Sequence, residues 1–248
     1  MKKILVIQSR KAPERQKAER DAFVRAAGES AQLDFISTLD VEQRWDSPAE
    51  LVRGYDGVIL GGSSDFFWHY ETSEFEEEYQ GARMVLARVK DLVEYLIERQ
   101  VPTLGICFGH QLIAEVFGGA VSHDGSQKKA GTHRVEVTAA GEDDVLLGEL
   151  APGFDAQYAH KNSVTRPPLG AVVIGNGPSC HFSALRYGKT CYTFQFHPEL
   201  VPSDLLSHPE ALAVYLPEGK TAADLVRPAP AAEGLIPAFI SRIAGSAA

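Results

Sequence analysis

One cysteine lies between two glycines, two residues from each, in the segment Thr-Leu-Gly-Ile-Cys-Phe-Gly-His-Gln-Leu-Ile-Ala-Glu that begins at Thr103. The apolar run before the cysteine and the helical pattern after it are typical of a strand that turns sharply into a helix, where residues near the turn must be small. Gly105 and Gly109 meet that need. We therefore predict a nucleophile elbow at Cys107, where the helix N-terminus favours thiolate over thiol. A buried cysteine in an ordinary strand-to-helix turn is the alternative.

A base for that cysteine is offered by a second segment, Thr-Phe-Gln-Phe-His-Pro-Glu, which begins at Thr193. Pro198 favours an extended backbone at His197. The carboxylate of Glu199 can then fold back onto one imidazole nitrogen while the other nitrogen faces Cys107. His-Pro-Glu alone is a common loop tripeptide, but together with the elbow it predicts a nucleophile, a base and an orienting carboxylate.

These segments resemble the two signatures of the class I, triad-type glutamine amidotransferases, a family that includes the glutaminase domain of GMP synthase and free-standing γ-glutamyl hydrolases. GICFGHQ and FQFHPE occur in the family's order, and the glycine pair in VILGGSSD matches a third segment. The likeness covers about residues 4–199 and implies a flavodoxin-like α/β sandwich. Another α/β family with a cysteine elbow would share the elbow but not the His-Pro-Glu ending.

The resemblance assigns roles position by position. It makes Cys107 the nucleophile, His197 the base and acid, and Glu199 the orienting carboxylate. The backbone N–H groups of Gly62 and Phe108 would form the oxyanion hole. Residues that would help to bind the substrate are Gly61, Gln111, His160 and Asn162.

The activity implied is attack of Cys107 on the γ-carboxamide of glutamine or of a γ-glutamyl compound, followed by hydrolysis of a γ-glutamyl thioester. The expected partners are that small molecule, a synthetase chain that receives the ammonia, and a second copy of the chain in a homodimer. A free-standing hydrolase of γ-glutamyl amines or peptides is an alternative function. A non-catalytic binding protein on the same scaffold is another.

Three segments depart from the family's pattern. Where relatives commonly carry His-x-Asp, this chain has His160-Lys161-Asn162, which removes a negative charge near the expected substrate amine. Residues 126–132 lack a glutamate that many relatives place before the glycine. Residues 66–79, from Phe66 to Tyr79, are rich in aromatic side chains. These aromatic residues would either wall the substrate pocket or pack in the core or at a dimer contact.

The elements that must position these residues alternate along the first half of the chain. Apolar runs at 4–7, 33–36, 57–60 and 103–106 predict strands, and the stretches 14–27 and 75–99 predict helices, the first ending at Gly28. Strands that alternate with helices indicate a mostly parallel sheet covered on both faces, with the site at the carboxyl ends of the strands.

The second half predicts a smaller antiparallel or mixed part. Its expected strands are residues 134–138, 172–175, 182–185 and 191–196, and the segment 158–164 is treated as one further strand. We expect loops and short helices in 201–230 and a closing helix over 232–243. Residues 1–248 are predicted to form a single class I glutamine amidotransferase domain, with a core in 1–200 and the closing elements in 201–248.

Composition narrows the function classes. The 248 residues carry 24 Lys and Arg against 33 Asp and Glu, a net charge of −9, which disfavours a nucleic-acid partner. No apolar run approaches the roughly 18 residues that cross a bilayer, and no targeting signal is visible, so a cytoplasmic protein without a membrane partner is expected. The histidines and the cysteines Cys180 and Cys191 show no metal-ligand spacing. No metal and no cofactor are expected.

Overall fold

The computed structural model describes residues 1–68, 75–207, 212, 215, 216 and 218–245. The strands are β1 (Lys2–Gln8), β2 (Ala31–Ser37), β3 (Gly57–Leu60), β4 (Thr103–Ile106), β5 (Ala120–His123), β6 (Lys129–Val137), β7 (Gly153–His160), β8 (Asn162–Arg166), β9 (Val172–Gly177), β10 (Cys180–Tyr187) and β11 (Cys191–Phe194). The helices are α1 (Pro13–Ala27), α2 (Pro48–Leu51), α3 (Glu76–Glu98), α4 (Phe108–Val116), α5 (Ala139–Glu142), α6 (Pro202–Leu206), α8 (Ala222–Leu225), α9 (Pro230–Glu233) and α10 (Leu235–Arg242).

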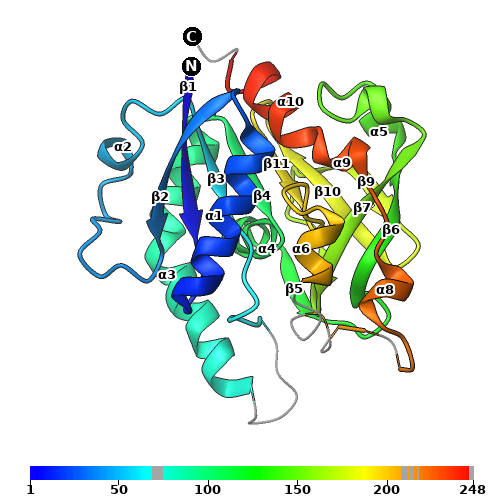
Figure 1. The fold of residues 1–248 in the computed structure, drawn as a ribbon. Helices are drawn as coiled ribbons and strands as arrows, with labels where there is room; N and C mark the ends of the chain where they lie inside the picture. The colour runs from blue at the N-terminus through cyan, green and yellow to red at the C-terminus, as the bar shows by residue number, and fades with distance from the viewer. Residues whose placement is uncertain (69–74, 208–211, 213–214, 217, 246–248) are drawn as a thin grey trace.

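Within these residues, nine strands form one sheet in the order β2-β1-β3-β4-β11-β10-β9-β6-β7, and β5 and β8 form a separate antiparallel pair (Figure 1). The first five strands in this order are parallel to one another. The remaining four continue the same sheet with antiparallel pairing. The predicted α/β fold with a parallel sheet and an antiparallel part is therefore confirmed.

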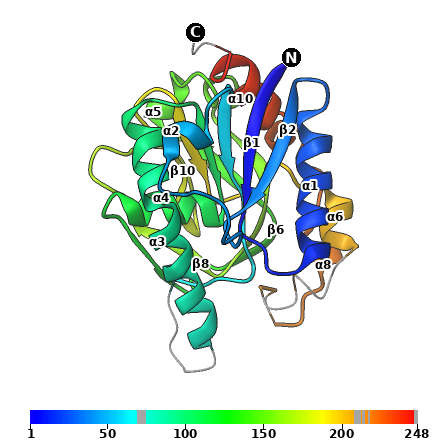
Figure 2. The same cartoon turned by 90° about the vertical axis from the view of Figure 1, so that its left-hand side faces the viewer.

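Helices cover both faces of the parallel half, as the alternation of side chains along β1 shows. Ile4 and Val6 lie in one hydrophobic cluster with residues of α1 and α10. Leu5 and Ile7 point to the other face and lie in a second cluster with residues of α3 and α4. Figure 2 shows α1 and α3 on opposite sides of β1 and β2. Apolar residues on both faces of β1 are thus buried, which is why this strand reads as a continuous apolar run.

The parallel strands bring the site residues to one edge of the sheet. Because β1, β3, β4 and β11 run in the same direction, the residues that follow them come together at their carboxyl ends. Arg10 follows β1, Gly62 follows β3, Cys107 follows β4 and His197 follows β11. Residues from four separate parts of the chain therefore become neighbours.

Two predicted elements need correction. The closing helix expected over 232–243 is two helices, α9 and α10, separated at Gly234. Pro237 has no N–H to donate to the carbonyl of Glu233, so the helical hydrogen bonds are interrupted there. The segment 158–164 is also two strands, because β7 ends the main sheet at His160 while β8 begins at Asn162 and pairs with β5.

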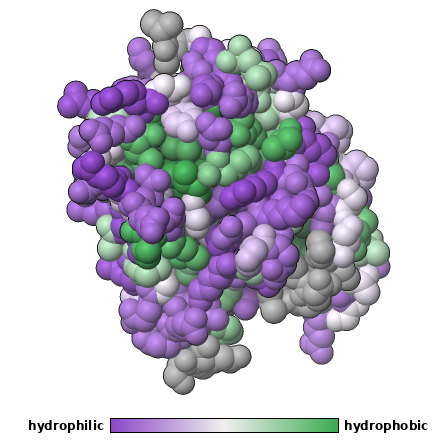
Figure 3. All heavy atoms as spheres, turned by 60° about the vertical axis from the view of Figure 1, so that its left-hand side comes forward, coloured by the Kyte–Doolittle hydropathy of each residue, from purple (hydrophilic) through white to green (hydrophobic). Residues whose placement is uncertain are grey.

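No helix in the described ranges is both long enough and apolar enough to span a membrane. The face drawn in Figure 3 is mostly hydrophilic and contains an area of hydrophobic side chains.

Candidate active site

The turn between β4 and α4 has the backbone strain of a nucleophile elbow. Cys107 adopts φ 51° and ψ −99°, a conformation that residues with a side chain rarely adopt. Its N–H donates a hydrogen bond of 2.7 Å to the carbonyl of Phe194 on β11, which fixes the turn to the neighbouring strand. Strain of this kind persists only where surrounding structure imposes it, and it is concentrated at functional sites.

The two glycines around Cys107 allow the tight packing of this turn. A Cβ atom on Gly105 would lie 2.9 Å from the carbonyl oxygen of Gly109. A Cβ atom on Gly109 would lie 2.2 Å from the carbonyl oxygen of Leu60, closer than non-bonded atoms approach. The start of α4 therefore packs directly on the end of β3. The expected need for small residues on either side of Cys107 is confirmed.

His197 and Glu199 are buried and joined by a short hydrogen bond. Nδ1 of His197 lies 2.7 Å from Oε1 of Glu199, and the N–H of His197 donates to the carbonyl of Gln157 on β7 at 2.8 Å. Burial disfavours the charged imidazolium. The negative charges of Glu199 and of the Cys107 thiolate outweigh that effect and raise the pKa of His197 to about 10. The arrangement can therefore keep His197 as an imidazolium at neutral pH.

Three side chains approach Gly62 at the position where any other residue would carry a Cβ atom. A Cβ atom there would lie 3.1 Å from Cε1 of His197, 3.3 Å from Nη2 of Arg10 and 3.6 Å from Cβ of Cys107. Any larger residue would displace one of these groups. Gly62 therefore leaves room for Cys107, His197 and Arg10 to approach one another.

Both proposed oxyanion donors have available N–H groups. Among the described residues, neither the N–H of Gly62 nor that of Phe108 donates a hydrogen bond, and Phe108 is the first residue of α4. Gly61, in contrast, uses its N–H to bind the carbonyl of Ile7 and its own carbonyl to accept from Gly109. The backbone of Gly61 thus holds the loop in place, and its substrate contact stays a prediction.

Two amide side chains, those of Gln111 and Gln195, connect the predicted substrate side to the nucleophile. Nε2 of Gln111 donates to the backbone carbonyl of Asn162 at 2.7 Å and to Oε1 of Gln195 at 3.1 Å. Nε2 of Gln195 in turn lies 3.7 Å from Sγ of Cys107. The motifs alone gave Gln195 no role. Its place two residues before His197 on an extended segment, where alternate side chains point the same way, is the signal that could have found it.

His160 lies in the same buried region, and its imidazole is neutral. Burial lowers the pKa of His160 to about 3. Its Nδ1 lies 3.1 Å from the carbonyl of Asn162 and 3.2 Å from Oγ of Ser163. The structure therefore brings His160, Asn162 and Gln111 together, as expected for one subsite.

The aromatic segment packs partly against the elbow. Phe66 and Trp68 are buried, and the Trp68 ring stacks on Phe108 at 5.3 Å between centroids. The backbone N–H of Trp68 donates to Oδ1 of Asn162 at 3.2 Å. Core packing thus describes these two rings, and the backbone of Trp68 holds the Asn162 side chain at the start of β8. Residues 69–74 of the segment lie outside the described residues.

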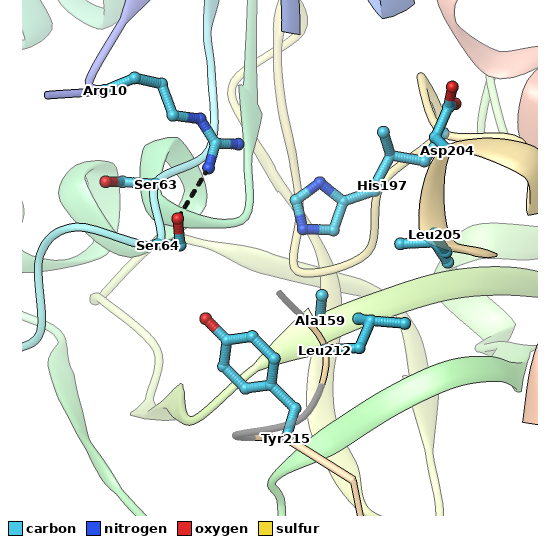
Figure 4. A pocket seen from close by; sticks show the side chains of 10 residues that line it. Arg10, Ser63, Ser64, Ala159, His197, Asp204, Leu205, Leu212 and Tyr215 are labelled. Carbon is cyan, nitrogen blue, oxygen red and sulfur yellow. Dashed lines mark hydrogen bonds between the residues drawn. The ribbon is translucent and has the colours of Figure 1, made fainter. Parts of the chain in front are cut away.

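A buried ion pair beside the triad has no counterpart in the motifs. Arg10 lies 3.1 Å from Glu19 of α1, and the side chains are 16% and 3% exposed. Nη1 of Arg10 also donates to Oγ of Ser64. Arg10 and His197 both line a cavity of about 130 Å³ (Figure 4). In the sequence, the only signal for this ion pair is the polar stretch 8–11, which contains Arg10 and follows the apolar run 4–7.

The remaining cysteines and His110 are buried in the protein interior. Cys180 and Cys191 are free and buried, and burial raises the pKa of each thiol. His110 is buried with Nδ1 2.7 Å from Oγ1 of Thr193, and burial lowers its pKa to about 3. Within the ranges that the structure describes, no cluster of three or more His, Cys, Asp or Glu side chains is placed to hold a metal.

The chain is similar in sequence to known proteins. The family model described as "Glutamine amidotransferase class-I" matches residues 41–212. The chain is 30% identical over 156 residues to the glutamine-hydrolyzing GMP synthase subunit of Sulfurisphaera tokodaii, a match that spans 62% of this chain and 73% of that protein. It is 35% identical over 149 residues to the protein of the same name from Methanothermobacter thermautotrophicus, spanning 60% of this chain and 67% of the relative.

Solved structures share the fold at lower sequence identity. A glutamine amidotransferase from Thermotoga maritima superposes with a TM-score of 0.71 at 19% identity and covers 99% of both chains. A glutamine amido transferase from Methylobacillus flagellatus gives 0.62 at 17% identity, covering 98% of this chain and 92% of that one. The family model spans β3, the Cys107 elbow and His197, so the resemblance read from the motifs is confirmed. The chain belongs to the class-I glutamine amidotransferases, a family of enzymes.

Proposed function

We propose that the chain hydrolyses the γ-carboxamide of glutamine or of a γ-glutamyl compound through a thioester on Cys107. One observation carries this proposal. Cys107 in its strained elbow, His197 and Glu199 lie next to one another, in that spatial order, at one buried edge of the sheet. This order of nucleophile, base and orienting group is the arrangement that activates a cysteine.

In the first half of the reaction, Sγ of Cys107 forms a bond to the γ-carbonyl carbon. The carbonyl oxygen becomes negative and accepts from the N–H groups of Gly62 and Phe108, which make no other hydrogen bond among the described residues. Each such donor is worth about 3 kcal/mol in other enzymes. His197 then gives a proton to the leaving nitrogen and the C–N bond breaks.

In the second half, His197 takes a proton from water, and the resulting oxygen nucleophile attacks the thioester carbon. The carbon–sulfur bond breaks, glutamate leaves and the Cys107 thiolate is restored. Glu199 keeps the imidazole in the tautomer that presents Nε2 to both steps. Gln111, His160 and Asn162 are proposed to hold the glutamate part of the substrate.

A direct test is glutamate release from L-glutamine by the native chain and by Cys107→Ala. We expect the substitution to abolish turnover, a loss of about 10⁴-fold or more, with unchanged circular dichroism. Mass spectrometry of the native chain after rapid acid quenching should detect a γ-glutamyl adduct on the peptide that contains Cys107. Turnover that survives in Cys107→Ala would contradict the thioester mechanism.

Two functions share this chemistry. The relatives are named as subunits of GMP synthase, which suggests that a synthetase chain receives the ammonia. The second candidate is a free-standing hydrolase of γ-glutamyl amines or peptides, and the cavity beside His197 supports it because free ammonia needs no such space. Glutamine alone as substrate would favour the first function, and γ-glutamyl amides with larger amines would favour the second.

We also propose that residues 1–248 form a single domain, since one hydrophobic cluster joins Ile4 of β1 to Ala244 beyond α10. A homodimer and a cytoplasmic location, both expected from the sequence, stay predictions.

A further inference from the structure

The cavity shown in Figure 4 touches the proposed triad at His197. Its lining residues in the described chain are Arg10, Ser63, Ser64, Ala159, His197, Leu200, Asp204, Leu205, Leu212 and Tyr215. His197 is the one member of the proposed triad among these lining residues. The amide residues near Cys107, which are Gln111, Asn162 and Gln195, are not among them. In the proposed reaction His197 protonates the leaving nitrogen, so this cavity lies where the leaving amine departs.

The walls of the cavity differ in chemistry. Figure 4 shows Arg10 and Ser64 on one side and Leu205 and Leu212 on the other, with the ring of His197 between them. The hydroxyl of Tyr215 points toward Ser64. A small amine with a short carbon chain and an anionic end would match both walls.

Arg10 is held so that part of its guanidinium remains available. Nε of Arg10 donates to Oε1 of Glu19, and Nη2 lies 3.1 Å from the same oxygen. The other oxygen of Glu19 accepts from Nε2 of Gln8 at 2.9 Å. Nη1 donates to Ser64 at 3.3 Å. Each Nη carries two N–H groups, so within the described residues at least one N–H on each nitrogen has no hydrogen-bonded acceptor. This pair matches the two oxygens of a carboxylate.

The acidic groups nearby are already engaged. Glu19 is buried beneath Arg10 and fixes its direction. Asp204 also lines the cavity, but its carboxylate binds Arg25 at 2.5 Å and the N–H of Val201 at 2.9 Å, and Figure 4 shows it pointing away from the cavity. Among the described lining residues, Arg10 is thus a cation, in addition to the imidazolium of His197, that faces a bound leaving group.

We propose that this cavity binds the leaving amine of the substrate and that Arg10 binds a carboxylate on that amine, so the substrate class is the γ-glutamyl derivatives of amino acids. This inference rests on the proposed thioester chemistry at Cys107. The γ-glutamyl C–N bond breaks as the tetrahedral intermediate collapses to the thioester, and the amino acid leaves with the proton from His197. Water then releases glutamate from Cys107.

The test compares γ-glutamylglycine with γ-glutamylglycinamide, which has the same shape but no negative charge on the leaving amine. We expect the native chain to prefer γ-glutamylglycine in kcat/KM by about 10- to 100-fold, the usual range for a charged hydrogen-bonded pair. Arg10→Gln should remove that preference, because it should lower kcat/KM for γ-glutamylglycine about 10- to 100-fold more than kcat/KM for the glycinamide. Arg10→Lys, which keeps the charge without the planar fork, should retain part of it.

Arg15→Gln is the matched control. Arg15 also donates to Ser64 and pairs with a carboxylate, Asp65, but it is 49% exposed and does not line the cavity. It should keep the preference of the native chain. An equal loss for both substrates in Arg10→Gln would mean that Arg10 only supports the fold, and no preference in the native chain would overturn the proposal.

Binding to the Cys107→Ala chain separates this inference from the proposed reaction. By calorimetry, that chain should bind γ-glutamylglycine about 10- to 100-fold more tightly than the glycinamide, and adding Arg10→Gln should equalise the two. Discrimination in binding without turnover in the native chain would refute the thioester mechanism alone. Equal affinity, or binding of neither compound, would refute the role of Arg10.

Discussion

At the scale of single residues, the site depends on charges that are buried together. His197 is 4% exposed and Glu199 is 2% exposed, so their interaction is little screened by water. Burial alone would keep His197 neutral, and the negative partners reverse that outcome and raise the pKa of His197 to about 10. The imidazolium is therefore present below about pH 10 and is lost as the pH rises through that value.

The first prediction concerns Glu199→Gln. Glutamine can still accept the hydrogen bond from Nδ1, but it removes a negative charge that raises the pKa of His197. The alkaline limb of kcat/KM, which reports loss of the imidazolium, should then move to lower pH. Activity at the optimum should fall by about 10²- to 10⁴-fold, as in other triads. The measurement is a pH profile of glutamate release between about pH 5 and 11, a range that brackets the raised pKa of His197.

Glu98→Gln provides the control for that profile, because Glu98 is an exposed carboxylate at the end of α3. It should leave both limbs in place. An unchanged alkaline limb in Glu199→Gln would show that the charge of Glu199 does not set the proton affinity of His197.

At the scale of elements, the most local features could be predicted best. The strands at 57–60 and 103–106 have the predicted bounds, and α1 ends before Gly28, which has φ 52°. Each of these depends on a short apolar run or a nearby glycine. The division of residues 158–164 into β7 and β8 depends instead on which partner strand lies on each side, and a single sequence does not state that.

The second prediction concerns the contact between α4 and β3. In Gly109→Ala the new methyl group would meet the carbonyl of Leu60 at 2.2 Å, so the elbow must shift. We expect the free energy of unfolding to fall by roughly 1–3 kcal/mol or more. The rate of glutamine hydrolysis should fall by more than the loss of folded protein explains, because Cys107 is two residues away and must move with the elbow. Urea unfolding and a glutaminase assay measure the two effects.

Gly125→Ala is the matched control for this prediction. Gly125 has no neighbouring atom within 4 Å of the added Cβ and no positive φ. Its unfolding free energy should stay within about 0.5 kcal/mol of the native value. Equal stability of the Gly109 and Gly125 variants would mean that the close approach of α4 to β3 is not required.

At the scale of the whole molecule, the site combines segments that no local pattern connects. The proposed triad could be predicted because its members, Cys107, His197 and Glu199, occur in two short motifs. The ion pair of Arg10 and Glu19, the contact between Trp68 and Asn162, and the position of Gln195 could not, since each arises from packing of distant segments. These contacts nevertheless lie beside the proposed reaction centre, so the proposed substrate preference depends on the fold as a whole.

The third prediction tests whether the C-terminal segment belongs to the same cooperative unit. Phe239 of α10 is fully buried in the cluster that also contains Ile4 and Val6 of β1. Phe239→Ala should therefore destabilise the whole chain by about 3–5 kcal/mol. Scanning calorimetry should record one transition moved to lower temperature, while Met84→Ala, which alters a residue 43% exposed, should leave the midpoint nearly unchanged. An early separate transition in Phe239→Ala, with the main one unmoved, would mean that residues 201–248 unfold independently and that the chain is not a single domain.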